Sequence, residues 1–182
     1  MRVNSQRPGN IPPRIEPTSV FTGLKIRPIV AGVAVDYVAT YVAMYAWIIN
    51  FVSKQLSEQG ELSEEAIQTF LASPEGLLIG FVIGTLGTVL GGFVAGRMAK
   101  NLEIKHGAFV GAGSLMVSAL EQAMSGNGAS LPQWYVVMSS LAIVPAGALG
   151  AYIAQRLRQL RADDRTPAAK WPDLKPPFGR LS

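Results

Sequence analysis

The sequence predicts an all-α, polytopic membrane protein with four transmembrane helices. Its composition, the length of its apolar runs and the charges of its loops predict this fold class. The 182-residue chain is 49% hydrophobic and 15% charged, whereas a soluble domain is typically about 25% charged. A spanning helix needs about 20 apolar residues. Four runs meet that need, and we expect helices at about 28–52, 76–97, 107–125 and 134–155.

The four runs define one membrane domain over residues 28–155, between a Pro-rich tail at 1–27 and a basic, Pro-rich tail at 156–182. The first tail is too long and too often broken by proline for the start of a signal peptide, so we expect it to be retained. The longest loop, residues 53–75, contains an amphipathic pattern. This pattern predicts a short helix over 63–72.

Local signals mark where two of the predicted spans begin. Pro28 suits a first helical turn, because its missing N–H has no bond to lose there. Before the second span, Ser73 is a candidate N-cap and Pro74 a candidate first helical residue, while Glu75 favours the positive end of the helix. We therefore expect the second helix to begin directly after Ser73. Inside the fourth span, Pro145 predicts a kink.

The second span carries seven glycines between Gly76 and Gly96. In a soluble helix each glycine costs about 1 kcal/mol, but in a membrane glycine allows helices to approach closely. Rows of small residues also follow the third and fourth spans. We expect helix packing at Gly80, Gly84, Gly87, Gly91, Gly107, Gly111 and Gly150.

Segments rich in Lys and Arg alternate along the chain with loops that hold few of them. This pattern predicts the orientation, because an excess of Lys and Arg marks the cytoplasmic side. Five precede the first span, three lie in or next to the turn after the second, and seven follow the fourth, whereas the other two loops together hold one. We expect both termini and the middle turn in the cytoplasm. The residues that set this orientation are Arg97, Lys100, Arg156 and Arg158.

The second and fourth spans end in similar sequences. LGGFVAGRM at 90–98 matches LGAYIAQRL at 149–157 in the order of apolar, small, aromatic and basic residues. The match indicates two tandem helical hairpins, related by an axis along the membrane normal. The alternative is that both spans arrived at the composition common to membrane helices.

Residues 91–113, GGFVAGRMAKNLEIKHGAFVGAG, combine a G-G-aromatic-x-A-G-R segment, a short basic turn and H-G-x-x-x-G. This stretch of about 25 residues resembles the centre of small bacterial four-helix integral membrane proteins of uncharacterised function. The resemblance implies the four-helix topology and a place in the bacterial cytoplasmic (inner) membrane. It implies no activity.

Two carboxylates lie inside the predicted spans, Asp36 and Glu121. A charged group at the membrane centre costs about 2.5–3.5 kcal/mol on insertion scales, so each is a possible ion or proton site. For Asp36 the alternative is a hydrogen bond to a hydroxyl on another helix, or packing at an oligomer interface. Glu121 is close enough to the outer surface to reach water. Their depths differ by about 9 Å, which gives no reason to pair them.

The residue types exclude several chemistries. The chain has no cysteine and one histidine, His106, so disulfides, thiolate sites and His-based metal clusters are excluded. The glycine run of the second span is not a phosphate-binding loop, because no K-[ST] follows it, and no Ser/His/Asp arrangement is present. We expect no enzyme activity, no catalytic residue, no metal, no cofactor and no nucleic-acid partner. The lipid bilayer is the expected partner, and the basic tails can contact anionic headgroups.

Two functional hypotheses follow. The first is a structural or accessory subunit of a membrane assembly, or a homo-oligomer, because the small-residue faces exceed what one four-helix bundle needs to bury. The alternative is a small transporter or channel for a cation or protons that uses Asp36 or Glu121.

Overall fold

The computed structural model describes residues 21–59, 64–124 and 131–163, and within these ranges the chain is all-helical. The predicted all-α class is therefore confirmed for the described residues. Most of both predicted tails lies outside them. The helices are α1 (Ile26–Gln59), α2 (Glu64–Ala72), α3 (Pro74–Ala99), α4 (Glu103–Met124) and α5 (Gln133–Asp163).

Three of the described helices are long and apolar enough to cross a membrane. The apolar segments are Ile26–Leu56 of α1, all of α3, and Gln133–Ala162 of α5. The remaining long helix, α4, has 22 residues, but serines and the Glu121-Gln122 pair make it more polar. The structure thus supports a membrane protein with three strongly apolar helices.

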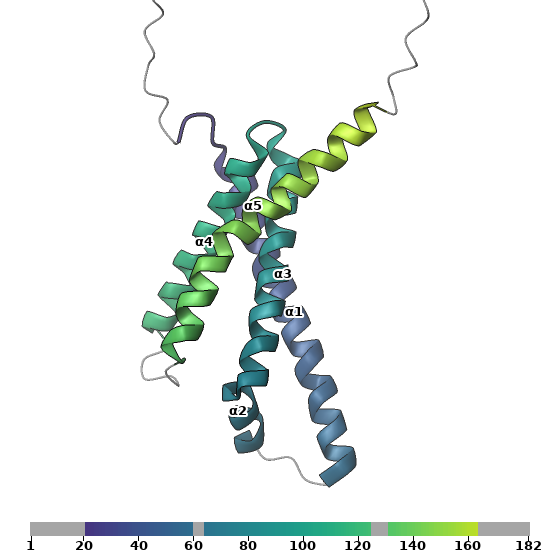
Figure 1. Cartoon of the computed structure of the whole chain (residues 1–182), viewed down its shortest axis with the longest axis vertical. Coiled ribbons are helices and arrows are strands. Elements are labelled where there is room, and N and C mark those ends of the chain that lie inside the picture. The colour runs from purple at the N-terminus through teal and green to yellow at the C-terminus, as the bar shows by residue number, and fades with distance from the viewer. Residues whose placement is uncertain (1–20, 60–63, 125–130, 164–182) are drawn as a thin grey trace, which may run out of the picture.

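The helix α3 is the centre of the arrangement, because it contacts each of the other four. Figure 1 shows α1 beside α3 and α4 beside α5. The beginning of α1, the turn between α3 and α4, and the end of α5 lie together at one end of the molecule, which we call the turn end. The short α2 lies at the opposite end, the α2 end.

The contact between α1 and α3 depends on two glycines of α3. A methyl group at Gly91 would collide with the backbone carbonyl of Gly32, and one at Gly87 would collide with the hydroxyl of Thr40. The absence of a side chain therefore brings the backbones of α1 and α3 together. The same close approach places Asp36 of α1 directly against Gly87.

Glycines also bring α5 close to α3 and α4. Gly92 faces the carbonyl of Gly147, Gly150 faces that of Val89, and Gly111 faces that of Ile143. Gly107 also lies against Gly147. These contacts are near the middle of the helices and toward the turn end.

Two of the glycines expected in helix packing do not lie against the backbone of another helix. Gly84 has no heavy atom within 4 Å of the place that a Cβ would take, and at Gly80 the nearest is the hydroxyl of Tyr135 at 3.4 Å. Both belong to the half of α3 nearer the α2 end. There they border a small pocket of about 80 Å³ between α3 and α5.

The beginning of α3 follows the predicted local signals. Ser73 is the N-cap, its hydroxyl oxygen accepts the Gly76 N–H at 3.1 Å, and Pro74 occupies the first helical position. Glu75 lies in the first turn. The cap fixes where α3 begins, and it joins α2 to α3 with a single residue between them.

Two helices are longer than the apolar runs suggest. The first, α1, has 34 residues, or about 51 Å at 1.5 Å per residue, which exceeds a hydrocarbon core of about 30 Å. Its extension contains helix-forming Lys, Gln, Leu and Glu. The helix α5 continues past Gln155 for the same reason and contains Pro145 without interruption. Figure 1 shows α5 changing direction along its course.

Candidate functional site

The candidate site is a buried group of oxygen atoms around Asp36, which we call the Asp36 cluster. It consists of Asp36 and three hydroxyl residues from α1, α3 and α4. Ser114 lies 2.5 Å from Oδ2 of Asp36, Thr88 lies 3.0 Å from the same oxygen, and Thr40 lies 3.4 Å from Oδ1. Asp36 is 4% exposed, Thr88 1% and Ser114 2%.

The glycine contacts explain why the cluster can form. Since Gly87 and Gly91 let α1 approach α3, Asp36 reaches Thr88 one residue beyond Gly87. Thr88 also lies 3.0 Å from the carbonyl oxygen of Gly84, one turn earlier. A hydroxyl at this position in a helix commonly bonds its own backbone. Here the same hydroxyl faces both that carbonyl and the carboxyl group.

The hydroxyl groups of the cluster can hold Asp36 in either protonation state. There are four oxygen–oxygen contacts, three to Asp36 and one to the Gly84 carbonyl. The three hydroxyl groups supply one hydrogen each. An ionised Asp36 accepts all three of them, because the Gly84 carbonyl already accepts a backbone N–H within α3. A protonated Asp36 can instead donate to Thr88 while Thr88 donates to Gly84. Every polar group of the cluster therefore has a partner in either protonation state of Asp36.

No cation balances Asp36 within the described residues. Their one ion pair joins Arg158 and Glu103, at the turn end. A buried carboxylate without a cation is costly, so such groups are neutral, paired or functional. The charge environment therefore makes Asp36 a candidate functional group.

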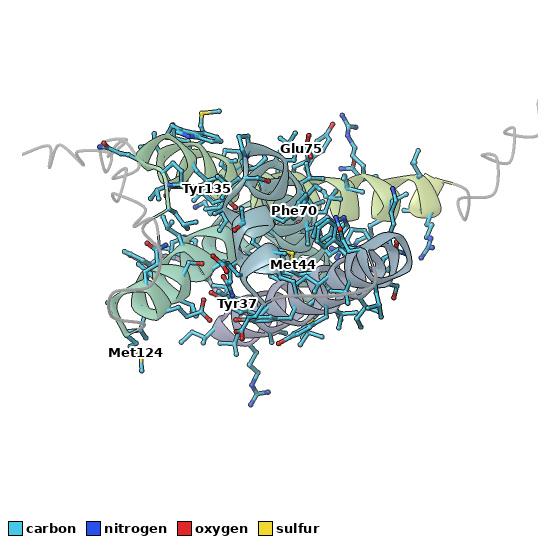
Figure 2. The ribbon with its side chains drawn as sticks, turned by 90° about the horizontal axis from the view of Figure 1, so that it is seen from below. Tyr37, Met44, Phe70, Glu75, Met124 and Tyr135 are labelled. Carbon is cyan, nitrogen blue, oxygen red and sulfur yellow. The ribbon has the colours of Figure 1, made fainter. Side chains whose placement is uncertain are left out.

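Among the described residues, two further polar pairs lie in a row between α1 and α4, beyond the cluster and without a hydrogen bond to it. The hydroxyl groups of Tyr37 and Ser118 are 3.3 Å apart, and the Tyr41 hydroxyl donates to Oε1 of Glu121 at 3.3 Å. The rings of the two tyrosines are 6.0 Å apart. Viewed from the α2 end, Tyr37 lies between α1 and α4, and Met124 lies at the edge (Figure 2).

The row leads from the interior to the surface. Asp36 is buried, Tyr37 is half-buried, and Tyr41 is 50% exposed. The structure does not place Asp36 and Glu121 in contact, in agreement with their different depths. It instead places both on one row, separated by the two tyrosines. The four-residue spacing of Tyr37, Tyr41 and Tyr45 could have indicated such a row, but not its partner helix.

The basic residues at the turn end also have structural roles. Both Nη atoms of Arg158 donate to carbonyl oxygens at the end of α3: Gly96 and Arg97 at 3.1 Å, and Lys100 at 3.0 Å. Arg158 also pairs with Glu103 at the beginning of α4. A cation at the last carbonyls of a helix offsets its negative end. Lys100 has a left-handed backbone, with φ of 60°.

The single histidine lies between helices. His106 is 1% exposed, and its Nε2 accepts the backbone N–H of Lys25 at 3.0 Å, directly before α1. Its Nδ1 lies 3.0 Å from the carbonyl oxygen of Leu102. These partners require a neutral ring with the hydrogen on Nδ1. His106 thus holds the beginning of α1 against α4, a role that sequence spacing did not indicate.

Other chemistries find less support in the described residues. They contain no group of three or more His, Cys, Asp or Glu side chains that could hold a metal ion. Each buried side-chain nitrogen or oxygen among them has a hydrogen-bond partner. The Asp36 cluster is therefore the strongest candidate for a site within the helices.

Comparison with known proteins gives no further assignment. No protein-family model matches the chain, and neither a curated protein nor a solved structure matches it. The geometry of the described residues therefore carries the functional argument.

Proposed function

We propose that this protein is a small, non-enzymatic transporter or channel that moves protons across a membrane. Asp36 is the residue that binds and releases the proton. The observation that carries the proposal is the burial of Asp36, which is 4% exposed and has three hydroxyl partners but no cation among the described residues. A buried acid whose hydroxyl partners can hold it with or without its proton has the chemistry of a proton carrier.

The row of hydroxyl groups supports a route for the proton. Tyr37, Ser118 and Tyr41 carry hydroxyl groups that can both donate and accept. Glu121 ends the row at an exposed position. A proton released from Asp36 reaches Glu121 along these groups and the water molecules that bridge them, because no hydrogen bond of the described residues joins Asp36 to Tyr37 or Ser118 to Tyr41. Pro145 and the glycines of α3 and α5 allow the helix motion that opens the opposite path.

We further propose that four helices cross the bacterial inner membrane, with both termini in the cytoplasm. The arrangement in Figure 1 supports this orientation, because the beginning of α1 and the end of α5 lie at the same end. The 22 residues of α4 correspond to about 33 Å, enough to cross the hydrocarbon core. The tandem hairpins would then be α1 with α3 and α4 with α5.

The test is proton flux in proteoliposomes that contain the full chain and a pH-sensitive dye, driven by a potassium diffusion potential. We expect flux from the unmodified protein, a loss of at least about tenfold in Asp36→Asn, and a smaller loss in Tyr41→Phe and Glu121→Gln. The control is Tyr45→Phe, which removes a hydroxyl from the same face of α1 beyond the row. Flux equal to empty liposomes, or unchanged by Asp36→Asn, would contradict the proposal.

The second candidate is a structural or accessory subunit, or a homo-oligomer. It is favoured by the pairing of every buried polar side-chain atom in the described residues, since the cluster can then act only to hold α1, α3 and α4 together. In that case Asp36→Asn lowers stability and leaves no flux to lose. Cross-linking and native mass spectrometry in mild detergent test this candidate, because a strictly monomeric particle without partners contradicts it.

A further inference from the structure

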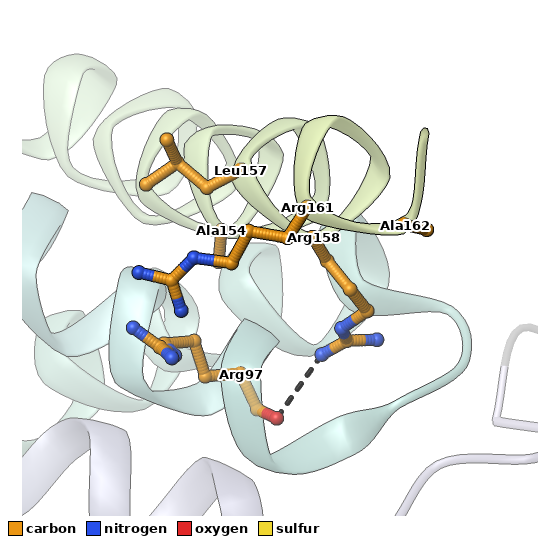
Figure 3. A pocket seen from close by; sticks show the side chains of 6 residues that line it. All are labelled: Arg97, Ala154, Leu157, Arg158, Arg161 and Ala162. Atoms are coloured by element: carbon orange, nitrogen blue, oxygen red, sulfur yellow. Dashed lines mark hydrogen bonds between the residues drawn. The ribbon is translucent and has the colours of Figure 1, made fainter. Parts of the chain in front are cut away.

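A cavity of about 510 Å³ opens at the turn end, between the end of α3 and the last turns of α5. Three of its lining residues are arginines, and the others are apolar: Arg97, Arg158, Arg161, Ala154, Leu157 and Ala162. Figure 3 shows the guanidinium groups of Arg97 and Arg161 on the same side of the cavity, and that of Arg158 turned the other way.

Arg158 is fully engaged by the protein itself. Its two Nη atoms make four contacts, with three carbonyl oxygens and Glu103. Since each Nη carries two hydrogens, only the Nε–H remains. Arg158 therefore forms a wall of the cavity. It holds α5 against the end of α3 and so brings the other two arginines together.

Among the side chains that the structure describes, neither Arg97 nor Arg161 forms an ion pair. Arg97 lies over the ring of Phe93, 5.6 Å from its centroid, which leaves its N–H groups available. The one ion pair in the described part of the chain belongs to Arg158. Two guanidinium groups that share a cavity repel each other, and an anion bound between them offsets that repulsion by attracting both. Their planar forks suit the bidentate binding of a phosphate group.

The position of the cavity points to a lipid phosphate. The apolar segments of α3 and α5 end at Ala99 and Ala162, so the arginines lie at the level where headgroups begin. Leu157 lines the cavity and is 42% exposed, and Ile153, one turn nearer the membrane centre, is 38% exposed. The arginines thus lie at the level of a phospholipid headgroup, and the apolar surface lies at the level of its acyl chains.

We propose that Arg97 and Arg161 bind the phosphate of an anionic phospholipid, whose acyl chain lies along Ile153 and Leu157 of α5. The site is built from two helices, which distinguishes it from a diffuse attraction between basic tails and the membrane surface. It is independent of proton transport by Asp36. Loss of one function leaves the other measurable.

The test is native mass spectrometry of the full chain in mild detergent, titrated with phosphatidylglycerol or with phosphatidylcholine of the same acyl chains. Each basic residue near an anionic surface contributes about fivefold to binding. We expect phosphatidylglycerol to bind more tightly than phosphatidylcholine. The double variant Arg97→Gln/Arg161→Gln should lose about 25-fold in phosphatidylglycerol affinity and keep its helical circular dichroism.

The matched control is Arg156→Gln/Lys105→Gln, which removes the same charge from exposed positions outside the cavity. It should keep at least half of the affinity. An equal loss in the control would show a general charge effect and overturn the site. Equal binding of the two lipids would also overturn it, as would displacement of phosphatidylglycerol by an equal concentration of inorganic phosphate, which identifies a site for the free anion.

Discussion

At the scale of single residues, the position of a glycine decides what it does. Gly92 and Gly84 lie on the same helix, but only Gly92 faces another backbone, the carbonyl of Gly147. Gly84 has open space where its Cβ would be. The two residues therefore form a matched pair for measuring the value of close helix approach.

We predict that Gly92→Ala destabilises the protein by about 1–3 kcal/mol, because the new methyl group forces α5 away from α3. Gly84→Ala should be neutral or stabilising by up to about 1 kcal/mol, because alanine has the better helix propensity. Reversible unfolding in mixed detergent micelles, followed by circular dichroism, measures both. Equal effects of the two variants would show that the contact with Gly147 contributes nothing.

The sequence predicted part of this residue-scale picture. Asp36 attracts notice because a charge within an apolar run is unusual. Thr88 and Ser114 do not, because a single Thr or Ser in a membrane helix can bond its own backbone. Only the rotation of α3 and α4 about their axes decides that both face Asp36. For the same reason, spacing alone placed Gly84 among the packing glycines and left out Gly92, whereas in the structure Gly92 is the one that faces another backbone.

At the scale of elements, one side chain joins three helix ends. Arg158 of α5 binds the last carbonyls of α3 and the first turn of α4 through Glu103. The turn between α3 and α4 needs this support, because Lys100 and Leu102 both have positive φ, which non-glycine residues rarely adopt. The positive-inside pattern predicted a basic residue here but not its contacts.

We predict that Arg158→Gln destabilises the protein by about 1–2 kcal/mol, since it removes charge-assisted hydrogen bonds from partly exposed groups. Arg156→Gln is the control, because in the described part of the chain Arg156 contacts just the exposed hydroxyl and ring of Tyr152. It should change stability by less than about 0.5 kcal/mol. A double-mutant cycle with Glu103→Gln isolates the ion pair. A coupling energy near zero would assign the effect to the carbonyl contacts.

Helix ends were predictable where capping chemistry marks them and less so elsewhere. Ser73 and Pro74 define the beginning of α3 to the residue. The end of α1 has no such signal, and helix-forming polar residues carry it to Gln59, beyond the apolar run. Hydropathy therefore marks the part of a helix that lipid can cover, and capping residues mark the helix itself.

At the scale of the whole molecule, the set of helices that cross the membrane decides on which side each loop lies. The chain has no cysteine, so single cysteines can report accessibility without a background. We predict that Ser63→Cys and Ser125→Cys react with a membrane-impermeant maleimide in intact cells. Asn101→Cys, in the turn between α3 and α4, should react only after permeabilisation. Labelling of Ser125→Cys from the inside alone would show that α4 does not cross.

The Asp36 cluster also sets an order for biosynthesis. Asp36 belongs to the first long helix, whereas Thr88 follows 52 residues later and Ser114 follows 78 residues later. At about 5–20 residues per second of translation, α1 waits roughly 4–16 s for the last hydroxyl of its cluster. Until Thr88 is synthesised, its acid group has no native partner beyond Thr40, in the next turn of its own helix. A nascent chain arrested before residue 114 should therefore expose α1 to membrane proteases that the finished chain resists.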